Sequence, residues 1–311
     1  MTAPEAAPLA EPDDSAGSLH SVTPSPESEI PDLPEDVIRG YRLTHRIAEG
    51  GMGAVFRAKQ VSLDRTVAIK VLKPRLAKDA SFLQRFNREA RAVARLNHRN
   101  VVSAIDVGAS RGWHYLVMEY VDGETLQSIL DRQTSLPERD AIRIAWQICA
   151  ALRHAHKHGL VHRDIKPDNV IVARNGDAKL CDLGLAKDVR SDQTTLTVVG
   201  TAMGTPRYIS PEQAAGQDDV DIRSDLYSLG ATFYHMVCGQ PPFTGGSAVS
   251  LMARHMSEEV TPVNLRAPHV SPGTAFVIEK LLAKERAERY QTPALAMADL
   301  RLVASGRSPV P

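Results

Sequence analysis

Cysteine is scarce in this sequence, which contains only Cys149, Cys181 and Cys238 among 311 residues. Their wide separation matches no metal-binding or redox spacing, and so few cysteines exclude a disulfide scaffold. We therefore predict buried free thiols in a protein of the reducing cytoplasm.

Long apolar runs are also missing. No stretch approaches the roughly 18 consecutive apolar residues that a membrane-spanning helix needs. The opening residues Met1, Thr2 and Ala3 lead into acidic sequence, and not into the basic and then apolar pattern of a signal peptide. We expect a cytoplasmic location and no membrane span.

The chain has no excess charge of either sign, because 37 lysines and arginines balance 37 aspartates and glutamates. Residues 1–40 nevertheless hold nine acidic residues and one basic residue, which is a formal charge of −8. The remainder carries 36 basic and 28 acidic residues, or +8, and this suits an anionic ligand such as a nucleotide. That excess is far below the level typical of nucleic-acid binding, so we expect no nucleic-acid partner.

The first 38 residues differ in composition from the rest of the chain. Residues 1–38 are rich in proline, serine, alanine and acidic side chains. They bury too little apolar surface to offset the entropy lost on ordering, so we predict a disordered tail. The alternative is a docking or autophosphorylated tail, because Ser21, Thr23 and Ser25 lie close to prolines. The whole chain is 43% apolar, enough for a core of one two-lobed domain or two ordinary domains.

One nine-residue run carries the densest chemistry. Residues 161–169 read Val-His-Arg-Asp-Ile-Lys-Pro-Asp-Asn, which places Asp164, Lys166 and Asn169 within six positions. Phosphoryl transfer needs a carboxylate at the attacking hydroxyl, a cation for the moving phosphoryl group and an oxygen ligand for a metal ion. A polar surface turn would explain a lone His-Arg-Asp. It does not explain the full run followed by Asp182, Leu183 and Gly184.

This run resembles the catalytic loop of the protein kinases, and a lysine two residues after the aspartate is the Ser/Thr form. The chain from about Tyr41 to about Ala304 is similar to bacterial Ser/Thr kinases of the eukaryotic (Hanks) type. The resemblance implies an α+β, bilobal protein kinase fold, with a small β-rich N-lobe containing one main helix and a larger, mainly helical C-lobe. The implied parts are the N-lobe at 39–121, the C-lobe at 122–304 and a C-terminal tail at 305–311.

A glycine tract lies between two predicted strands. The residues Gly50, Gly51 and Gly53 would let backbone amides approach phosphate oxygens without interference from a Cβ. Alone, such a tract is more often a hairpin turn. By resemblance it is the glycine-rich loop, although Ala48 stands where the family has glycine. The resemblance implies that ATP is bound by Ile47, Ala48, Glu49, Gly50, Gly51, Met52, Gly53, Ala54, Val55, Ala68, Lys70, Glu119 and Val121. Within that set, Val55 would cover the adenine, and backbone groups of Glu119 and Val121 would bond its edge.

The resemblance assigns the chemical steps to the nine-residue run and to Asp182. It implies that Asp164 positions the substrate hydroxyl and accepts its proton late, and that Lys166 neutralises charge on the γ-phosphoryl group. It implies that Asn169 and Asp182 bind Mg²⁺, for which Mn²⁺ is an alternative. Leu183 stands where the family has phenylalanine and would pack beneath the main N-lobe helix.

Lys70 ends the apolar run Val67–Ile69. By resemblance it pairs the α- and β-phosphates and is held by Glu89, on a predicted helix over residues 80–96. A lysine at such a position is otherwise a snorkelling strand-edge residue. Glu89 alone could equally be solvated.

Residues 185–209 resemble an activation segment. Thr197 and Thr201 are the candidate phosphorylation sites, and Arg163 would supply a cation for the phosphate. Thr205 resembles the threonine that bonds the catalytic aspartate and lysine and marks Ser/Thr preference. A flexible threonine-rich loop without a phosphosite is the alternative.

Three further residues resemble the family's structural supports. Asp225 would brace the backbone of the catalytic loop. Glu212 and Arg289 would form a buried ion pair at the end of the activation segment.

The sequence thus predicts an ATP-dependent Ser/Thr kinase that acts on proteins and phosphorylates its own activation loop, with a homodimer as one route to trans-autophosphorylation. The alternative is a pseudokinase, a nucleotide-binding scaffold that transfers nothing. Its mark would be a lost lysine, aspartate or asparagine, and none is lost here. A kinase of the same fold acting on a small molecule is a further alternative, but such relatives generally lack the Ser-Pro-Glu of residues 210–212.

Overall fold

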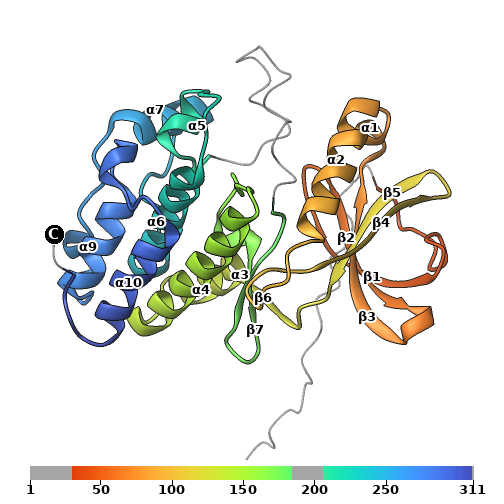
Figure 1. Ribbon diagram of the computed structural model, residues 1–311, viewed down its shortest axis with the longest axis horizontal. Coiled ribbons are helices and arrows are strands. Elements are labelled where there is room, and N and C mark those ends of the chain that lie inside the picture. The colour runs from red at the N-terminus through yellow and green to blue at the C-terminus, as the bar shows by residue number, and fades with distance from the viewer. Residues whose placement is uncertain (1–29, 184–205, 310–311) are drawn as a thin grey trace, which may run out of the picture.

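The computed structural model describes residues 30–183 and 206–309. Figure 1 shows two lobes, a sheet with two short-to-medium helices on one side and a mainly helical body on the other. The predicted bilobal α+β fold is confirmed. Within the described ranges, none of the helices combines the length and apolarity needed to cross a membrane.

The N-lobe is built on a five-stranded antiparallel sheet in the order β1-β2-β3-β5-β4. Its strands are β1 (Tyr41–Glu49), β2 (Gly53–Gln60), β3 (Arg65–Leu72), β4 (Ala104–Ser110) and β5 (Trp113–Glu119). The central strand β3 is buried from Val67 to Leu72, as expected of an apolar run covered on both faces. Its position carries Lys70 into the interior of the lobe.

Helices α1 (Pro74–Ala77) and α2 (Ala80–Val93) follow β3. The carboxylate of Asp79 caps α2 by accepting the amides of Ser81 at 2.8 Å and Phe82 at 3.1 Å. Phe82 and Phe86 pack against the sheet in one apolar cluster with Leu72 and Leu116. This amphipathic face fixes the position of Glu89, which is buried on the same helix.

The other face of the sheet is covered by a segment that precedes it. Ile30, Val37 and Ile38 are at most 4% exposed and pack in one cluster with strands β1, β2, β3 and β5. The side chain of Arg46 donates to the carbonyl of Ile30 at 2.7 Å. The predicted tail at 1–38 is therefore wrong for residues 30–38, because three buried apolar side chains, each worth about 1.5–3 kcal/mol, hold them to the lobe. Residues 1–29 lie outside the described ranges.

The C-lobe contains a small sheet in the order β6-β7-β8 and a helical body (Figure 1). Helix α6 is its centre, because all but two of its residues are buried. The strands are β6 (Gly123–Thr125), β7 (Val170–Ala173) and β8 (Ala178–Leu180). The helices are α3 (Leu126–Gln133), α4 (Glu138–Lys157), α5 (Pro211–Ala214), α6 (Ile222–Cys238), α7 (Ala248–Ser257), α8 (Val263–Arg266), α9 (Pro272–Leu281) and α10 (Pro293–Ala304). The described residues also form 3₁₀ turns, which are η1 (Val61–Leu63) in the N-lobe and η2 (Pro167–Asn169) and η3 (Arg286–Glu288) in the C-lobe.

The lobes are joined behind the cleft by backbone hydrogen bonds. The amide of Val102 donates to the carbonyl of Leu180 at 2.9 Å, and the amide of Leu180 donates to that of Asn100 at 2.9 Å. The side-chain amide of Asn100 donates to Ala178 at 2.8 Å. Because residues 100–102 pair with β8, strand β4 begins only at Ala104.

Candidate active site

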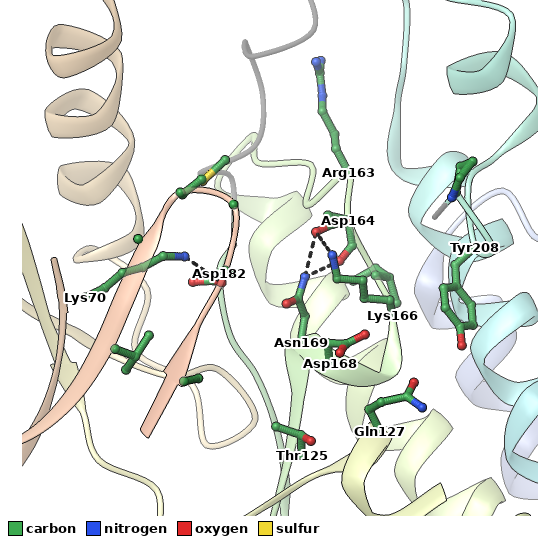
Figure 2. Close-up of a pocket in the computed structure, with 18 of the residues that line it drawn as sticks. Lys70, Thr125, Gln127, Arg163, Asp164, Lys166, Asp168, Asn169, Asp182 and Tyr208 are labelled. Carbon is green, nitrogen blue, oxygen red and sulfur yellow. Dashed lines mark hydrogen bonds and ion pairs between the residues drawn. The ribbon is translucent and has the colours of Figure 1, made fainter. Parts of the chain in front are cut away.

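A cleft of about 660 Å³ lies between the lobes (Figure 2). The N-lobe contributes the β1–β2 loop, Lys70 of β3 and the first turn of α1. The C-lobe contributes the stretch from Arg163 to Asn169, Asp182 and the segment 206–209. Residues more than 100 positions apart in the chain therefore face one space.

Three side chains of the nine-residue run form one hydrogen-bonded group. The ammonium of Lys166 pairs with Asp164 Oδ2 at 2.8 Å. The amide Nδ2 of Asn169 donates to the Asp164 carbonyl at 2.8 Å and to its Oδ2 at 3.0 Å. Asn169 is presented by the 3₁₀ turn η2, which Pro167 opens. Figure 2 shows this group on the C-lobe side of the cleft.

The backbone of this run is braced from below, as the sequence predicted for Asp225. The buried carboxylate of Asp225 accepts the amides of His162 at 2.8 Å and Arg163 at 2.7 Å. Burial raises the pKa of Asp225, while the two amide hydrogen bonds favour the charged form. The backbone φ of Arg163 is 69°, a left-handed conformation that costs an ordinary residue about 1–2 kcal/mol. The two amide bonds offset that strain.

His162 connects the two backbone segments that carry the carboxylates of the site. It is fully buried, and its Nε2 lies 2.9 Å from the carbonyl oxygen of Cys181. A carbonyl only accepts, so Nε2 carries the proton and Nδ1 is free to accept the amide of Asp164 at 3.2 Å. One neutral imidazole thus ties Asp164 to the residue before Asp182.

Lys70 pairs across the cleft with Asp182. Its ammonium lies 2.8 Å from Asp182 Oδ2, and the lysine is only 7% exposed. The expected ion pair with Glu89 is therefore not formed among the described residues. A buried ammonium needs a close counter-charge, and in this arrangement of the lobes Asp182 supplies it. Glu89 itself is buried on α2.

The electrostatics of Asp182 follow from that pair. Burial alone would raise its pKa, but the Lys70 ammonium, with Lys166 nearby, holds the pKa of Asp182 below its usual value. Its backbone φ is 57°, the second left-handed ordinary residue at the site. Leu183 follows and is buried beneath α2 beside Ala90 and Val93. That packing is the role expected for the residue after Asp182.

The predicted nucleotide contacts fall into two groups. Those that line the cleft are Ala48, Glu49, Gly50, Gly51, Met52, Gly53, Val55 and Lys70. Those that do not line it are Ile47, Ala54, Ala68, Glu119 and Val121. Ala54 is fully buried in the opposite core of the lobe, which excludes a nucleotide contact from its side chain. Gly53 has a structural reason to be glycine, because a Cβ there would overlap the Val71 carbonyl of the paired strand.

Two of the remaining predicted contacts sit at the segment between the lobes. The amide of Glu119 donates to Ser103 at 2.9 Å, and its carboxylate pairs with Lys179 at 2.7 Å. Only the carbonyl of Glu119 is therefore left for the expected bond to adenine. Val121 packs in one apolar cluster with Ala68 of β3 and Ile171 of β7.

The polar groups around Asp182 fit a divalent metal. Because Nδ2 of Asn169 donates to Asp164, its Oδ1 remains as an acceptor, and Asp182 keeps its Oδ1 when Oδ2 pairs with Lys70. In residues 30–183 and 206–309, no cluster of three or more His, Cys, Asp or Glu side chains could hold a metal alone. Mg²⁺ is typically held by one or two protein oxygens and substrate phosphates, which matches this sparse set.

Sequence reasoning missed several residues of the cleft. Arg75 donates to the carbonyl of Gly51 at 3.2 Å and so supports the β1–β2 loop. Gln213 donates to the carbonyl of Arg163 at 2.8 Å and connects α5 to the catalytic loop. Thr125 and Gln127, from β6 and α3, also line the cleft (Figure 2). No pattern signalled these contacts. The predicted Thr197, Thr201 and Thr205, with Gly184, lie outside the described residues.

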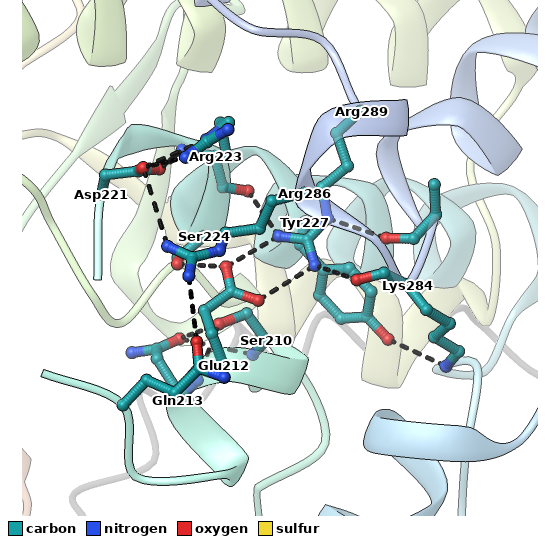
Figure 3. Close-up of polar contacts among 12 residues, drawn as sticks. Ser210, Glu212, Gln213, Asp221, Arg223, Ser224, Tyr227, Lys284, Arg286 and Arg289 are labelled. Carbon is teal, nitrogen blue, oxygen red and sulfur yellow. Dashed lines mark hydrogen bonds and ion pairs between the residues drawn. The ribbon is translucent and has the colours of Figure 1, made fainter. Parts of the chain in front are cut away.

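A buried ion pair supports the cleft from the C-lobe, as the sequence predicted (Figure 3). Arg289 is 2% exposed and forms a bidentate pair with Glu212, at 2.7 and 2.9 Å. Burial would raise the pKa of Glu212, but Arg289 and the hydroxyl of Ser224 lower it below its usual value. Ser210 caps α5 through a reciprocal capping box with Gln213. The pair and the cap fix the chain just beyond residue 209.

Comparison with known proteins agrees with this geometry. The protein kinase domain family matches residues 41–299. The Ser/Thr-protein kinase PknB of Mycobacterium leprae is 42% identical over 86% of this chain and 44% of its own length. The Ser/Thr-protein kinase pkn3 of Myxococcus xanthus is also 42% identical, over 86% of this chain and 50% of its own length. The chain thus spans about half the length of these curated relatives.

Solved structures show the same architecture. The crystal structure of a double mutant of the Mycobacterium tuberculosis PknI kinase domain superposes with a TM-score of 0.71 at 26% identity. The match covers 88% of this chain and 100% of that one. The chain therefore belongs to the protein kinase domain family, and its resemblance to the eukaryotic-like Ser/Thr kinases of bacteria is confirmed.

Proposed function

We propose that this chain is an ATP-dependent protein Ser/Thr kinase, which transfers the γ-phosphoryl group of ATP to serine and threonine hydroxyls of proteins. The observation that carries the proposal is the meeting of Lys70, Asp164, Lys166, Asn169 and Asp182 at one cleft. Each side chain that the chemistry needs is present, which disfavours the pseudokinase alternative.

The proposed chemistry is positioning and electrostatics. Asp164 orients the attacking hydroxyl and takes up its proton late, because it is the carboxylate of the hydrogen-bonded group on the C-lobe side. Lys166 already lies against Asp164, close enough to neutralise charge on the γ-phosphoryl group.

The phosphates and metal would be held by the remaining groups. The Oδ1 atoms of Asn169 and Asp182 are the oxygens we assign to Mg²⁺, with Mn²⁺ as an alternative. When bound, the metal would neutralise charge on the phosphates. Lys70 would exchange its pair with Asp182 for the α- and β-phosphates and for Glu89.

Regulation by autophosphorylation is part of the proposal. Arg163 extends away from the Asp164 group (Figure 2), and its Nε is buried with no partner among the described residues. A phosphate on Thr197 or Thr201 would supply that partner through charge-assisted bonds. A homodimer is the route we propose for phosphorylation in trans. Dependence on ATP, and the free cysteines, suit a cytoplasmic location.

The direct test measures transfer of label from radioactive ATP to a generic basic protein. We expect Asp164→Asn to lower the rate by at least about 100-fold, because removal of a catalytic base costs that much or more. The matched control is Asp64→Asn, at an exposed residue of φ 52°, a backbone conformation that asparagine adopts readily. Equal transfer of label by the wild type and by Asp164→Asn would refute the proposal that this chain is a kinase.

The autophosphorylation sites need a separate test. Mass spectrometry of the wild-type protein after expression should find phosphate on Thr197 or Thr201, and Lys70→Ala should lack it. Mixing a tagged Asp164→Asn chain with the active chain distinguishes transfer in trans, because only transfer in trans can label the inactive copy. Phosphate at those threonines in the Lys70→Ala protein would count against autophosphorylation.

A further inference from the structure

A buried polar chain runs through the C-lobe to the wall of the cleft beyond the nucleotide. The wall is the segment Pro206–Ile209, which lines the cleft, and Figure 2 shows Tyr208 of this segment on the far side of Asp164 from Lys70. A polypeptide that brings a hydroxyl to Asp164 must pass this wall. What holds the wall in place therefore bears on how a protein substrate binds.

His255 of α7 makes one of the bonds that hold it. The imidazole is 0% exposed, and its Nε2 lies 3.0 Å from the carbonyl oxygen of Arg207. Its Nδ1 lies 2.9 Å from the hydroxyl of Tyr227 on α6, which is equally buried. The ring of Phe243 meets the imidazole edge-on, with centroids 4.9 Å apart. These contacts leave the imidazole a single position.

The direction of each hydrogen bond follows from what its partner can do. The Arg207 carbonyl only accepts, so Nε2 of His255 must carry the proton. Nδ1 of the neutral ring then accepts, and the Tyr227 hydroxyl must donate to it. The hydroxyl oxygen is left to accept from the Lys284 ammonium at 3.4 Å (Figure 3). The three hydrogen bonds therefore run in one donor-to-acceptor direction, from Lys284 to Tyr227, from Tyr227 to His255 and from His255 to the Arg207 carbonyl.

Lys284 also fixes the helix that carries His255. Its ammonium donates to the carbonyl of His255 at 3.0 Å and to that of Arg254 at 3.4 Å. It thereby satisfies carbonyls of the last turn of α7. The backbone carbonyl of Lys284 accepts from Arg289 at 2.8 Å, and Arg289 pairs with Glu212. The loop after α9 thus holds both ends of the stretch from Arg207 to Glu212.

We infer that His255 is a positioning residue for the protein substrate, acting through the Arg207 carbonyl, and that Tyr227 sets its tautomer. The inference rests on the proposed kinase function. It predicts that loss of the hydrogen bond between His255 and the Arg207 carbonyl impairs binding of the protein substrate and leaves ATP binding unchanged. The nucleotide side of the cleft is lined by the N-lobe and Asp182, which this chain of bonds does not touch.

The test compares three variants by steady-state kinetics with a generic basic protein and ATP. Tyr227→Phe removes the donor to Nδ1 and frees the imidazole to adopt the other tautomer, which would repel the carbonyl. His255→Asn is too short for its amide nitrogen to reach Arg207, whereas His255→Gln places an N–H near the position of Nε2. We expect Tyr227→Phe and His255→Asn to raise KM for the protein about 10-fold, as loss of one buried hydrogen bond implies. His255→Gln should stay within about 2-fold of wild type.

Two further readouts separate this role from a general structural one. The KM for ATP should change less than about 2-fold in every variant, and thermal melting shows which variants are folded. An unaltered KM for the protein in folded Tyr227→Phe and His255→Asn would overturn the inference. So would a parallel rise in both KM values, or equal defects in the Gln and Asn variants. An inactive wild-type protein would instead refute the proposed kinase function.

Discussion

At the scale of single residues, the cleft holds charges with restricted access to bulk water. The Lys70 ammonium is the clearest case, because the residue is 7% exposed and Asp182 is its counter-charge at 2.8 Å. Removing one partner of such a pair leaves the other charge buried and uncompensated, which costs more than the pair itself contributes. Loss of Asp182 alone should therefore destabilise the fold, because it leaves the Lys70 ammonium buried without a counter-charge.

We predict that Asp182→Asn lowers the free energy of unfolding by about 3 kcal/mol, because it strands the Lys70 ammonium. Adding Lys70→Met should recover most of that loss, since the unbranched apolar chain fills the same space without a charge. Urea unfolding of the two single variants and the double variant forms a complete cycle. Asp64→Asn serves again as the control and should change stability by less than about 0.5 kcal/mol. Additive losses in the double variant would contradict this account.

The residue types at the site were readable from the sequence, but their partners were not. Asp164, Lys166 and Asn169 lie within six positions, so their proximity followed from the chain itself. Lys70 and Asp182 are 112 positions apart, and their contact depends on how the lobes meet. No local sequence pattern predicts a contact between residues so far apart in the chain. The resemblance predicted Glu89 as the partner of Lys70 instead.

At the scale of elements, α5 is a four-residue helix and is too short to be stable alone. Its position depends on the capping box of Ser210 and on the pair between Glu212 and Arg289. Arg289 also donates to the carbonyls of Ala283 and Lys284 at 2.7 and 2.8 Å. The guanidinium therefore joins α5 to the chain after α9.

We predict that Arg289→Met lowers the free energy of unfolding by about 3–5 kcal/mol, because Glu212 stays buried without its cation. The double variant Arg289→Met with Glu212→Met should be more stable than Arg289→Met alone. The matched control is Arg286→Met, whose partner Asp219 is 73% exposed, and its cost should be below about 1 kcal/mol. Urea unfolding measures all three. Equal costs at the two arginines would show that burial of the pair is not what stabilises α5.

Elements with a strong internal pattern were predictable. The apolar spacing of Phe82, Phe86 and Val93 predicted a helix over residues 80–96, because a helix buries one face of its own sequence, and α2 starts at Ala80 as predicted but ends at Val93. Composition failed at residues 30–38, where an acidic stretch conceals three buried apolar side chains. The sequence also predicts a strand over residues 101–107, but residues 100–102 bond to β8 of the other lobe and β4 begins at Ala104. Both misses depend on partners distant in the sequence.

At the scale of the whole molecule, two buried histidines of the C-lobe support the wall of the cleft. His255 holds the Arg207 carbonyl, and His235 lies 2.8 Å from the Tyr208 hydroxyl. Burial is the main cause that lowers the pKa of each to about 4. Both rings are therefore uncharged at neutral pH, and the wall they support is sensitive to acid.

The sign of the pH dependence follows from the two pKa values. The ordinary histidine pKa of 6.5 falls to about 4 in the folded protein, so between those values the unfolded chain binds more protons. Stability is therefore complete above pH 6.5 and declines as the pH falls toward 4. Each pH unit in that window is worth about 1.4 kcal/mol per group, so His255 alone costs about 2 kcal/mol by pH 5.

We predict that His255→Gln flattens the fall of the free energy of unfolding between pH 7 and pH 5 by about 2 kcal/mol, because glutamine does not titrate. Urea unfolding at several pH values measures this slope, and the difference between variant and wild type cancels other titrating groups, including His98 and His154, whose pKa values are also lowered. An unchanged slope in His255→Gln would mean that this histidine is accessible to protons in the folded protein. In that case acid would reach the wall of the cleft without unfolding the C-lobe, and protein-substrate KM would respond to pH before stability does.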